Sequence, residues 1–146
     1  MSELEQKTSK NIQTETFLKE KFRSLGFEQL TDIQKKASPK ILEKKDSLII
    51  APTGSGKTEC TVIPIFSLVK KTKQQAKIKV IYVTPLRALN RDVFRRIIKY
   101  AEFEDLTIQI RHGDTSQSLR KKISESPPDI LITTPETLDI LLSQKN

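Results

Sequence analysis

The pattern of hydrophobic and polar positions predicts two helices in the first third of the chain. Apolar side chains recur at helical spacing between residues 16 and 25, and Gly26 marks the expected end of that helix. Thr31 opens a second helix that continues through Ile41, with a kink expected at Pro39. Both helices are therefore predicted to precede every strand.

After residue 46, strands and helices are expected to alternate. Short apolar or β-branched runs predict strands, and amphipathic runs between them predict helices. Such alternation is typical of βαβ units, so the predicted fold class is α/β, a parallel sheet with flanking helices. The strands are expected at 47–50, 78–84, 106–111 and 130–133, and the helices after residue 57, at 86–100, at 116–124 and from Pro135 onwards, capped by Thr134.

The first dozen positions are polar and show no periodicity, so residues 1–13 are predicted to form a flexible tail. Residues 14–146 are then predicted to form a single domain, because domains usually contain about 100–200 residues. Cys60 is the only cysteine, which excludes a disulfide framework and a zinc site with several thiolates, and is consistent with a reducing compartment such as the cytoplasm. No apolar run approaches the ~20 residues of a membrane-spanning helix, so no membrane partner is expected.

The net charge of +8 is concentrated in one part of the sequence. The segment from Lys70 to Lys99 contains ten basic residues and a single acid, Asp92. A localised basic segment is typical of proteins that bind a polyanion. A solvated loop followed by a solvated helix face accounts for the same charge pattern, so both interpretations stay open.

The segment Ala51-Pro52-Thr53-Gly54-Ser55-Gly56-Lys57-Thr58 fits the Walker A pattern, with Ala in place of the first Gly. Its glycines let the backbone wrap around phosphate oxygens, and the helix that follows adds a partial positive charge. The side chain of Lys57 is expected to reach the β- and γ-phosphates, and the hydroxyl of Thr58 to ligate Mg²⁺. A glycine-rich turn without a ligand is the alternative. The predicted nucleotide-binding residues are Thr53, Gly54, Ser55, Gly56, Lys57 and Thr58, of which Lys57 and Thr58 are also the predicted catalytic residues.

Five further blocks carry recognisable residue strings. They are Gly26-Phe27 with Thr31-Asp32-Ile33-Gln34, Thr84-Pro85-Leu86-Arg87-Ala88-Leu89, Arg111-His112-Gly113-Asp114-Thr115, Pro127-Pro128-Asp129-Ile130-Leu131-Ile132 and Thr133-Thr134-Pro135-Glu136-Thr137-Leu138. Together with the phosphate loop, these blocks resemble in order and wording the first RecA-like domain of a superfamily-two DEAD/DEAH-type helicase. The later blocks are closer to the large helicase-related (Lhr) family than to plain DEAD-box proteins, whose Pro-Thr-Arg-Glu-Leu string and Gly-Gly pair are absent.

The resemblance implies that Gln34 contacts the adenine of ATP and that Phe17, seventeen residues upstream, stacks on it. The residues themselves allow other roles. Thr31-x-x-Gln34 is also a capping box for the helix that begins there. Phe17 suits the apolar face of an amphipathic helix equally well. Leu30 stands where the family often has Pro, a departure that bears on adenine specificity.

The resemblance also implies contacts with the backbone of a nucleic acid strand. Arg87, Arg91, Arg95 and Lys99 recur every four residues and form one helical stripe, of which only Arg87 lies inside a family block. The other three suit a solvated helix face equally well. Helix capping alone is an alternative for Thr134. The residues predicted to bind nucleic acid are Thr84, Pro85, Arg87, Gly113, Asp114 and Thr134.

No Asp-Glu pair follows a predicted strand, so a Walker B site is not recognised in these residues. Hydrolysis of ATP requires a carboxylate for Mg²⁺ and an arginine finger. We therefore expect a partial, C-terminally truncated RecA-like domain that uses ATP and Mg²⁺ within an ATP-dependent helicase and is inactive alone. Its expected partners are single- or double-stranded DNA or RNA and a second RecA-like domain of the same parent chain.

Two other function classes are weighed against the helicase. One is another P-loop NTPase, although the Asn-Lys-x-Asp string of GTPases and the Leu-Ser-Gly-Gly-Gln string of transporter ATPases are both absent. The other is a nucleic-acid-binding module whose nucleotide site is vestigial. Nucleotide affinity distinguishes this module from the helicase.

Overall fold

The structure is a computed structural model that describes residues 3–72, 77–85 and 91–143. The chain divides into two units, an N-terminal unit over Met1–Leu68 and a C-terminal unit over Val69–Asn146. Among the described residues, no helix is long and apolar enough to cross a membrane.

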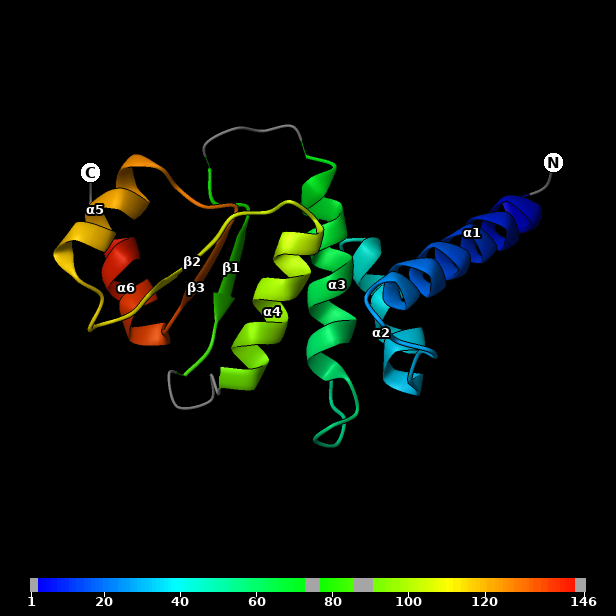
Figure 1. The fold of residues 1–146 in the computed structure, drawn as a ribbon. Helices are drawn as coiled ribbons and strands as arrows, with labels where there is room; N and C mark the ends of the chain where they lie inside the picture. The colour runs from blue at the N-terminus through cyan, green and yellow to red at the C-terminus, as the bar shows by residue number, and fades with distance from the viewer. Residues whose placement is uncertain (1–2, 73–76, 86–90, 144–146) are drawn as a thin grey trace. The chain divides into compact units, whose positions relative to one another are not determined.

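The N-terminal unit consists of helices joined by loops (Figure 1). Helix α1 spans Glu3–Ser24, α2 spans Asp32–Leu42 and α3 spans Lys57–Lys70, the last two residues of which belong to the C-terminal unit. The buried side chains come from all three helices and from Leu25, which follows α1; those of the helices include Leu18, Phe22, Ala37, Ile41, Cys60, Val62, Ile63 and Phe66.

The first helix begins earlier than the sequence predicts. Residues 3–13, expected to be a flexible tail, form the first turns of α1, and the side chains of residues 5, 6 and 8–13 are exposed. Their Glu, Gln and Lys side chains have high helix propensity, and a helix already formed over its buried end extends easily at one residue per hydrogen bond. The expected tail is therefore helical from Glu3 onwards, and the boundary of the domain at residue 14 stays a prediction.

The end of α1 follows the prediction at Gly26. The N–H of Gly26 donates to the carbonyl of Arg23 (2.9 Å), and the N–H of Phe27 donates to the carbonyl of Phe22 (3.0 Å). Gly26 has a φ of 93°, so this arrangement is a Schellman motif with glycine in its left-handed position. The rings of Phe22 and Phe27 pack edge to face at 5.5 Å, which adds the apolar contact typical of the motif.

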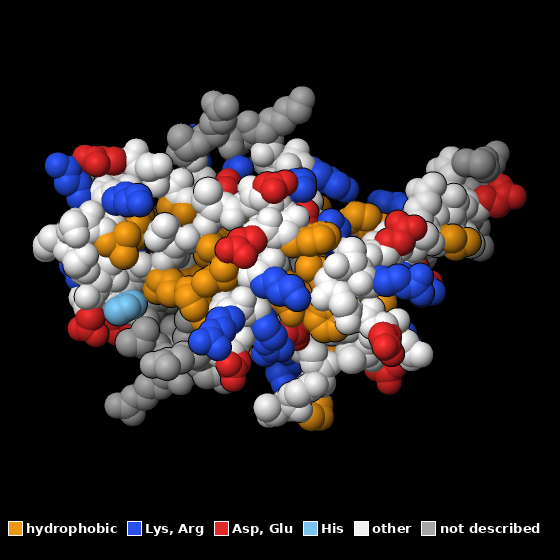
Figure 2. All heavy atoms as spheres, viewed as in Figure 1, with side chains coloured by type: hydrophobic (Ala, Val, Ile, Leu, Met, Phe, Trp, Pro, Cys, Tyr) orange, Lys and Arg blue, Asp and Glu red, His pale blue; other side chains and the backbone are white. Residues whose placement is uncertain are grey.

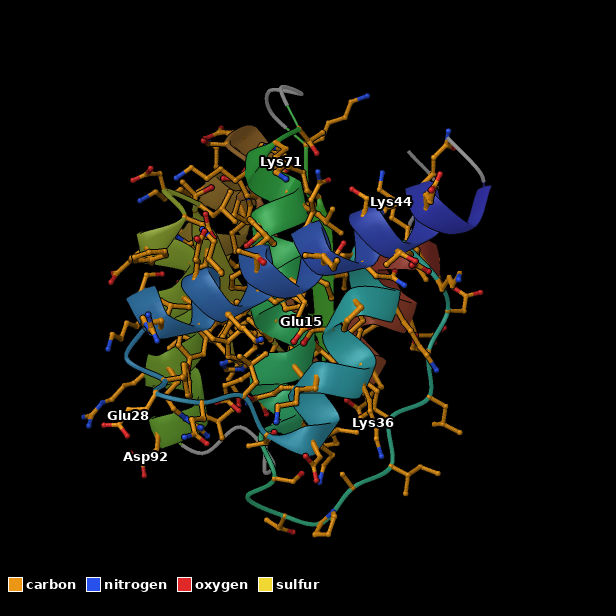
Figure 3. The ribbon with its side chains drawn as sticks, turned by 90° about the vertical axis from the view of Figure 1, so that its right-hand side faces the viewer. Glu15, Glu28, Lys36, Lys44, Lys71 and Asp92 are labelled. Atoms are coloured by element: carbon orange, nitrogen blue, oxygen red, sulfur yellow. The ribbon has the colours of Figure 1, made fainter. Side chains whose placement is uncertain are left out.

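The predicted buried strand at 47–50 is wrong. Within the described residues this segment pairs with no strand, and Leu48 and Ile50 are 87% and 82% exposed. A strand exists only where another strand satisfies its backbone groups. Figure 3 shows the chain after α2 running as an open loop, beyond Lys44. The prediction of a paired and buried strand is therefore incorrect for this apolar run.

The C-terminal unit contains the sheet. Strands β1 (Val80–Val83), β2 (Ile108–Arg111) and β3 (Ile130–Thr133) are all parallel, in the order β1-β3-β2. Helix α4 (Arg91–Phe103) lies on one side of the sheet, and α5 (Gln117–Glu125) and α6 (Pro135–Ser143) lie on the other (Figure 1). The predicted parallel sheet with flanking helices is confirmed. Of the helix expected at 86–100, residues 86–90 lie outside the described residues.

Asp129 joins the starts of all three strands. Its carboxylate accepts hydrogen bonds from Lys79 Nζ (2.7 Å), Thr107 N (2.9 Å) and Thr107 Oγ1 (2.8 Å). Its backbone carbonyl accepts from the N–H groups of Lys79 and Val80. Burial raises the pKa of Asp129, but the hydrogen bonds from Lys79 and Thr107 outweigh this effect and hold the pKa below its usual value. The ionised carboxylate therefore stabilises the amino-terminal edge of the sheet by hydrogen-bonding to residues that precede β1 and β2.

Candidate nucleotide and nucleic-acid sites

The segment predicted to bind phosphate forms a turn that leads directly into α3. Gly54 and Gly56 have φ angles of 78° and 89°, a left-handed conformation that glycine adopts without strain. The N–H of Ser55 donates to the carbonyl of Pro52 across the turn, at 3.4 Å. The predicted loop-to-helix transition is present, although no paired strand precedes it within the described residues.

The N-terminus of α3 offers donors for an anion. The first carbonyl used by the helix is that of Gly56, which accepts from the N–H of Cys60 at 2.9 Å. The N–H groups of Lys57 and Thr58 lie in the first turn of α3, where no preceding helical turn offers them a carbonyl. These amides carry the positive end of the helix dipole, and the chemistry of this end suits phosphate.

The side chain of Lys57 lies over the turn. Its ammonium group donates to the carbonyls of Ala51 and Pro52, the latter at 2.7 Å. Thr58 follows on the first turn of α3 and is half-buried. Ser55 Oγ is buried and has no hydrogen-bond partner among the described residues, so a polar group is held at the turn ready for a further partner. The lysine, the orphan hydroxyl and the helix amides together fit a phosphate group.

The start of α2 packs on the same turn. Thr31 caps α2, because its Oγ1 accepts from Gln34 N (3.4 Å) while Gln34 Oε1 accepts from Thr31 N (2.9 Å). The capping box is therefore formed, and Gln34 is only 2% exposed. Thr31 Oγ1 also donates to the carbonyl of Ser55 at 2.8 Å, which ties the cap of α2 to the phosphate loop. The adenine contact of Gln34 stays a prediction.

Phe17 is half-buried on α1, and the ammonium of Lys21 lies 6.0 Å from the centre of its ring. The fully buried aromatic side chain of this helix is that of Phe22. Phe22, and not Phe17, is therefore the aromatic core residue of α1. Stacking of Phe17 on adenine is still a prediction.

Cys60 is fully buried on α3. Its thiol donates to the carbonyl of Lys57 at 3.0 Å. Burial, with a smaller contribution from the charge of Glu59, raises the pKa of Cys60 to about 11, while Lys57 acts in the opposite direction. The thiol is therefore protonated at neutral pH and is a poor nucleophile.

The carboxyl ends of the three strands bring most of the predicted nucleic-acid contacts to one edge of the sheet. Val83 and Arg111 both stand in register with Thr133, and the N–H of Thr84 donates to the carbonyl of Thr133 at 3.0 Å. The segments that follow the three strands begin at Thr84, at His112 and at Thr134 and therefore leave the sheet side by side. Ligands of open parallel sheets bind at this edge.

Thr134 caps α6, as predicted. Its Oγ1 accepts from the N–H of Thr137 at 3.3 Å, and Pro135 occupies the first position of the helix. Thr134 is also largely buried. Capping of α6 explains the presence of Thr134 at this position. Its contact with nucleic acid remains a prediction.

The loop after β2 is a hydrogen-bonded turn. The N–H of His112 donates to Thr115 Oγ1 (2.8 Å), and the N–H of Thr115 donates back to the carbonyl of His112 (3.0 Å). The N–H of Asp114 donates to His112 Nδ1 at 3.2 Å. Gly113 and Asp114 are exposed at the tip, and Figure 2 shows the imidazole, in pale blue, at the molecular surface. These contacts make His112 a structural residue of the turn.

The predicted basic stripe is described in part. Arg95 and Lys99 on α4 are exposed. Their exposure is consistent both with contact to nucleic acid and with a solvated helix face. Arg87, the stripe residue inside a family block, lies outside the described residues, and the side chain of Arg91 is likewise not described. The contact of Arg87 with nucleic acid is therefore untested.

Two contacts of the candidate sites leave no signal in the sequence. The cap residue Thr31 also donates to the carbonyl of Ser55, and these residues are 24 positions apart. Arg120 on α5 donates to the carbonyls of Gly113 and Thr115 and was not singled out. It stands in a run with Lys121 and Lys122, so charge pattern alone does not distinguish it.

Comparison with known proteins adds to this geometry. Residues 31–146 match the DEAD/DEAH box helicase family. The chain is 37% identical over 142 residues to the ATP-dependent helicase Lhr-Core of Sulfolobus acidocaldarius. This alignment covers 89% of the present chain and 16% of the Lhr-Core protein. It is 33% identical over 140 residues to the Lhr helicase/uracil glycosylase of Escherichia coli, with 82% and 9% covered. The chain thus spans about a sixth or less of these curated relatives.

Two solved structures show the same fold. The Mycobacterium smegmatis helicase Lhr bound to ssDNA and AMP-PNP superposes with a TM-score of 0.65 at 35% identity, over 86% of this chain and 17% of that one. A hypothetical ATP-dependent RNA helicase from Sulfolobus tokodaii gives a TM-score of 0.68 at 30% identity, over 87% and 36%.

Proposed function

Because this chain belongs to the DEAD/DEAH box helicase family, we propose that it supplies the first RecA-like, ATP-binding part of an ATP-dependent nucleic-acid helicase. The single observation that carries the proposal is the glycine turn at residues 51–56, which leads directly into the N-terminus of α3 and is hydrogen-bonded to the cap of α2. This arrangement suits a triphosphate, and relatives along most of the chain are named ATP-dependent helicases.

In this proposal, the phosphates of ATP lie against the amides at the start of α3. The ammonium group of Lys57 exchanges the carbonyls of Ala51 and Pro52 for phosphate oxygens, with which it forms stronger, charge-assisted hydrogen bonds. The hydroxyl of Thr58 is the ligand that this loop offers to Mg²⁺, which neutralises phosphate charge when bound. Thr53, Gly54 and Ser55 complete the cradle. Gln34 and Phe17 are the proposed adenine contacts.

A nucleic acid strand is the proposed partner of the C-terminal unit. The support is the convergence of three loops at the carboxyl edge of the sheet, together with the exposed cations of α4. Thr84, Pro85, Gly113, Asp114 and Thr134 are proposed to contact the strand there, with Arg87 on the adjoining segment. Phosphate groups are common to DNA and RNA, so contacts to phosphate suit either nucleic acid and the proposal covers both.

Hydrolysis is proposed to require groups that this chain does not supply by itself. Phosphoryl transfer needs an acidic metal ligand and an arginine that stabilises the developing charge, in addition to the phosphate loop. We assign the arginine to a second RecA-like domain, the other proposed partner. The chain alone is therefore expected to bind ATP weakly and to hydrolyse it negligibly.

The nucleotide site is tested by titrating a fluorescent ATP analogue with Mg²⁺ into the wild-type chain and into Lys57→Ala. Loss of the ammonium group is expected to weaken binding about tenfold or more, since a charge-assisted contact contributes about 1.5–3 kcal/mol. Lys36→Ala is the matched control, because Lys36 is an exposed lysine on α2, labelled in Figure 3, and its loss removes the same charge.

Equal affinity of the wild-type and Lys57→Ala chains would overturn the proposal in favour of a binding module with a vestigial loop. Competition by unlabelled ATP and GTP identifies the base preference. Preference for GTP would instead support another class of P-loop NTPase.

A further inference from the structure

We propose that Arg120 is a positioning residue for the nucleic acid strand, because it holds the turn of residues 112–115 in the shape that presents Gly113 and Asp114 at the sheet edge. The inference rests on the proposed function, since it assigns a role within the same nucleic-acid site. Arg120 is expected to act through the turn and not by touching phosphate.

The guanidinium group of Arg120 bridges two carbonyls of the turn. Its Nε donates to the carbonyl of Thr115 at 2.8 Å, and its Nη2 donates to the carbonyl of Gly113 at 2.6 Å. Arginine presents these donors in a rigid planar fork, which lets one side chain fix two acceptors at a set separation. The side chain is partly buried by this contact.

The opposite end of the same turn is closed by its own residues. Thr115 exchanges two hydrogen bonds with the backbone of His112, and His112 Nδ1 accepts from the N–H of Asp114. Ser116 then caps α5, because its Oγ accepts from the N–H of Leu119. The helix that carries Arg120 is thus anchored directly beside the turn that Arg120 holds.

The contact changes the charge that the turn offers to a polyanion. Carbonyl oxygens carry partial negative charge and repel phosphate when they face it. The guanidinium group occupies the carbonyls of Gly113 and Thr115 and places a full positive charge behind the turn. Without Arg120, these two acceptors lose their partner and the turn is free to rotate them outwards. Loss of Arg120 is therefore predicted to lower the affinity for a nucleic acid strand.

Lysine is the informative substitution at this position. A lysine keeps the charge of Arg120 but offers a single ammonium point in place of the fork. If Arg120 touched phosphate directly, Arg120→Lys would preserve much of the affinity. If Arg120 acts through the turn, Arg120→Lys is expected to bind nearly as poorly as Arg120→Gln.

The experiment measures binding of a fluorescently labelled single-stranded oligonucleotide to the 146-residue chain at several salt concentrations. Both Arg120 variants are expected to bind about tenfold more weakly, and Arg120→Lys is expected to keep the salt dependence of the wild type. Lys121→Gln, which removes an exposed charge from the same helix, is the matched control and is expected to change affinity less than twofold. Hydrogen exchange at residues 112–115 is expected to accelerate in the Arg120 variants alone, while urea unfolding confirms that each variant is folded.

Three results would overturn the inference: wild-type affinity in both Arg120 variants, rescue by lysine, or unchanged exchange in the turn. Failure of the wild-type chain to bind any single strand would overturn the proposed nucleic-acid site itself and, with it, the role assigned to Arg120. The lysine comparison and the wild-type titration thus separate failure of the inference from failure of the function.

Discussion

Gly56 lies so close to Gln34 that a Cβ atom on the glycine would come within 2.3 Å of Gln34 Nε2. The amide end of a glutamine is usually free to move, but here Gln34 is buried and its Oε1 is held by the N–H of Thr31. The phosphate loop and the start of α2 are therefore fitted to each other without room for one additional methyl group.

Gly56→Ala is expected to destabilise the N-terminal unit and to impair nucleotide binding. A left-handed residue other than glycine costs roughly 1–2 kcal/mol, and the collision with Gln34 adds to that cost. Gly54→Ala is the matched control, since Gly54 is also left-handed but has nothing within 4 Å of its built Cβ. Urea unfolding followed by circular dichroism compares the two.

Equal losses in Gly54→Ala and Gly56→Ala would show that the collision has no energetic effect. A double variant with Gln34→Ala extends the test, because removal of the long side chain is expected to recover part of the additional loss at position 56. Coupling of this kind is measured by a double-mutant cycle.

Asp129→Asn is expected to lower the free energy of unfolding of the C-terminal unit by about 1–3 kcal/mol at neutral pH, because the ionised carboxylate accepts three hydrogen bonds. The folded-state pKa of Asp129 lies below its ordinary value of 3.8. Its stabilisation is therefore complete above that value and is lost as the pH falls through the folded-state pKa. The difference between wild type and variant should shrink over this acidic range.

Fluorescence provides a local measurement of that effect, since both tyrosines, Tyr82 and Tyr100, lie in the C-terminal unit and the chain has no tryptophan. Glu15→Gln serves as the control. Glu15 also has a lowered pKa, through its hydrogen bond and charge interaction with Lys19, but it is exposed on α1 (Figure 3). A pH-independent difference for Asp129→Asn would contradict the assignment.

Leu48→Ala is expected to change stability by less than about 0.5 kcal/mol, because Leu48 is 87% exposed. Ile63→Ala, a truncation of similar size on α3, is expected to cost about 2–5 kcal/mol, because Ile63 is buried. Urea unfolding of both variants measures the contrast. A large loss for Leu48→Ala would restore the interpretation of residues 47–50 as a buried strand.

Cys60 is expected to resist alkylation in the folded chain. With a pKa of about 11 and no exposed surface, on the order of a thousandth of the thiol is ionised at pH 8, and that fraction is shielded. Iodoacetamide should therefore modify Cys60 only after urea unfolds the N-terminal unit. Rapid modification in native buffer would contradict the burial of α3.

Local sequence signals predicted the elements whose contacts are local. Gly26 stops α1, Thr31 caps α2 and Thr134 caps α6 because each acts within a few residues of its own position. The strand at 130–133 was predicted to the residue, since a short apolar run bounded by Pro128 and Thr134 leaves little freedom.

Long-range contacts account for what sequence patterns missed. The apolar run at 47–50 does not specify whether another strand pairs with it, and in this structure none of the described residues does. The bond from Thr31 to the carbonyl of Ser55 likewise depends on how two distant segments meet. The role of Arg120 is not predictable from the sequence, because its partners are backbone carbonyls, which every residue type carries.

The hydrogen bonds of Asp129 at the amino-terminal edge of the sheet also determine how the strands align at the carboxyl-terminal edge. Each strand has four residues, and the pairing aligns Val83, Thr133 and Arg111 at the last rung. A slip of one position in any strand would turn its side chains to the other face and stagger the loops that follow. By aligning the first residues of the three strands, the carboxylate of Asp129 at one edge of the sheet also aligns the segments that follow the strands at the other edge.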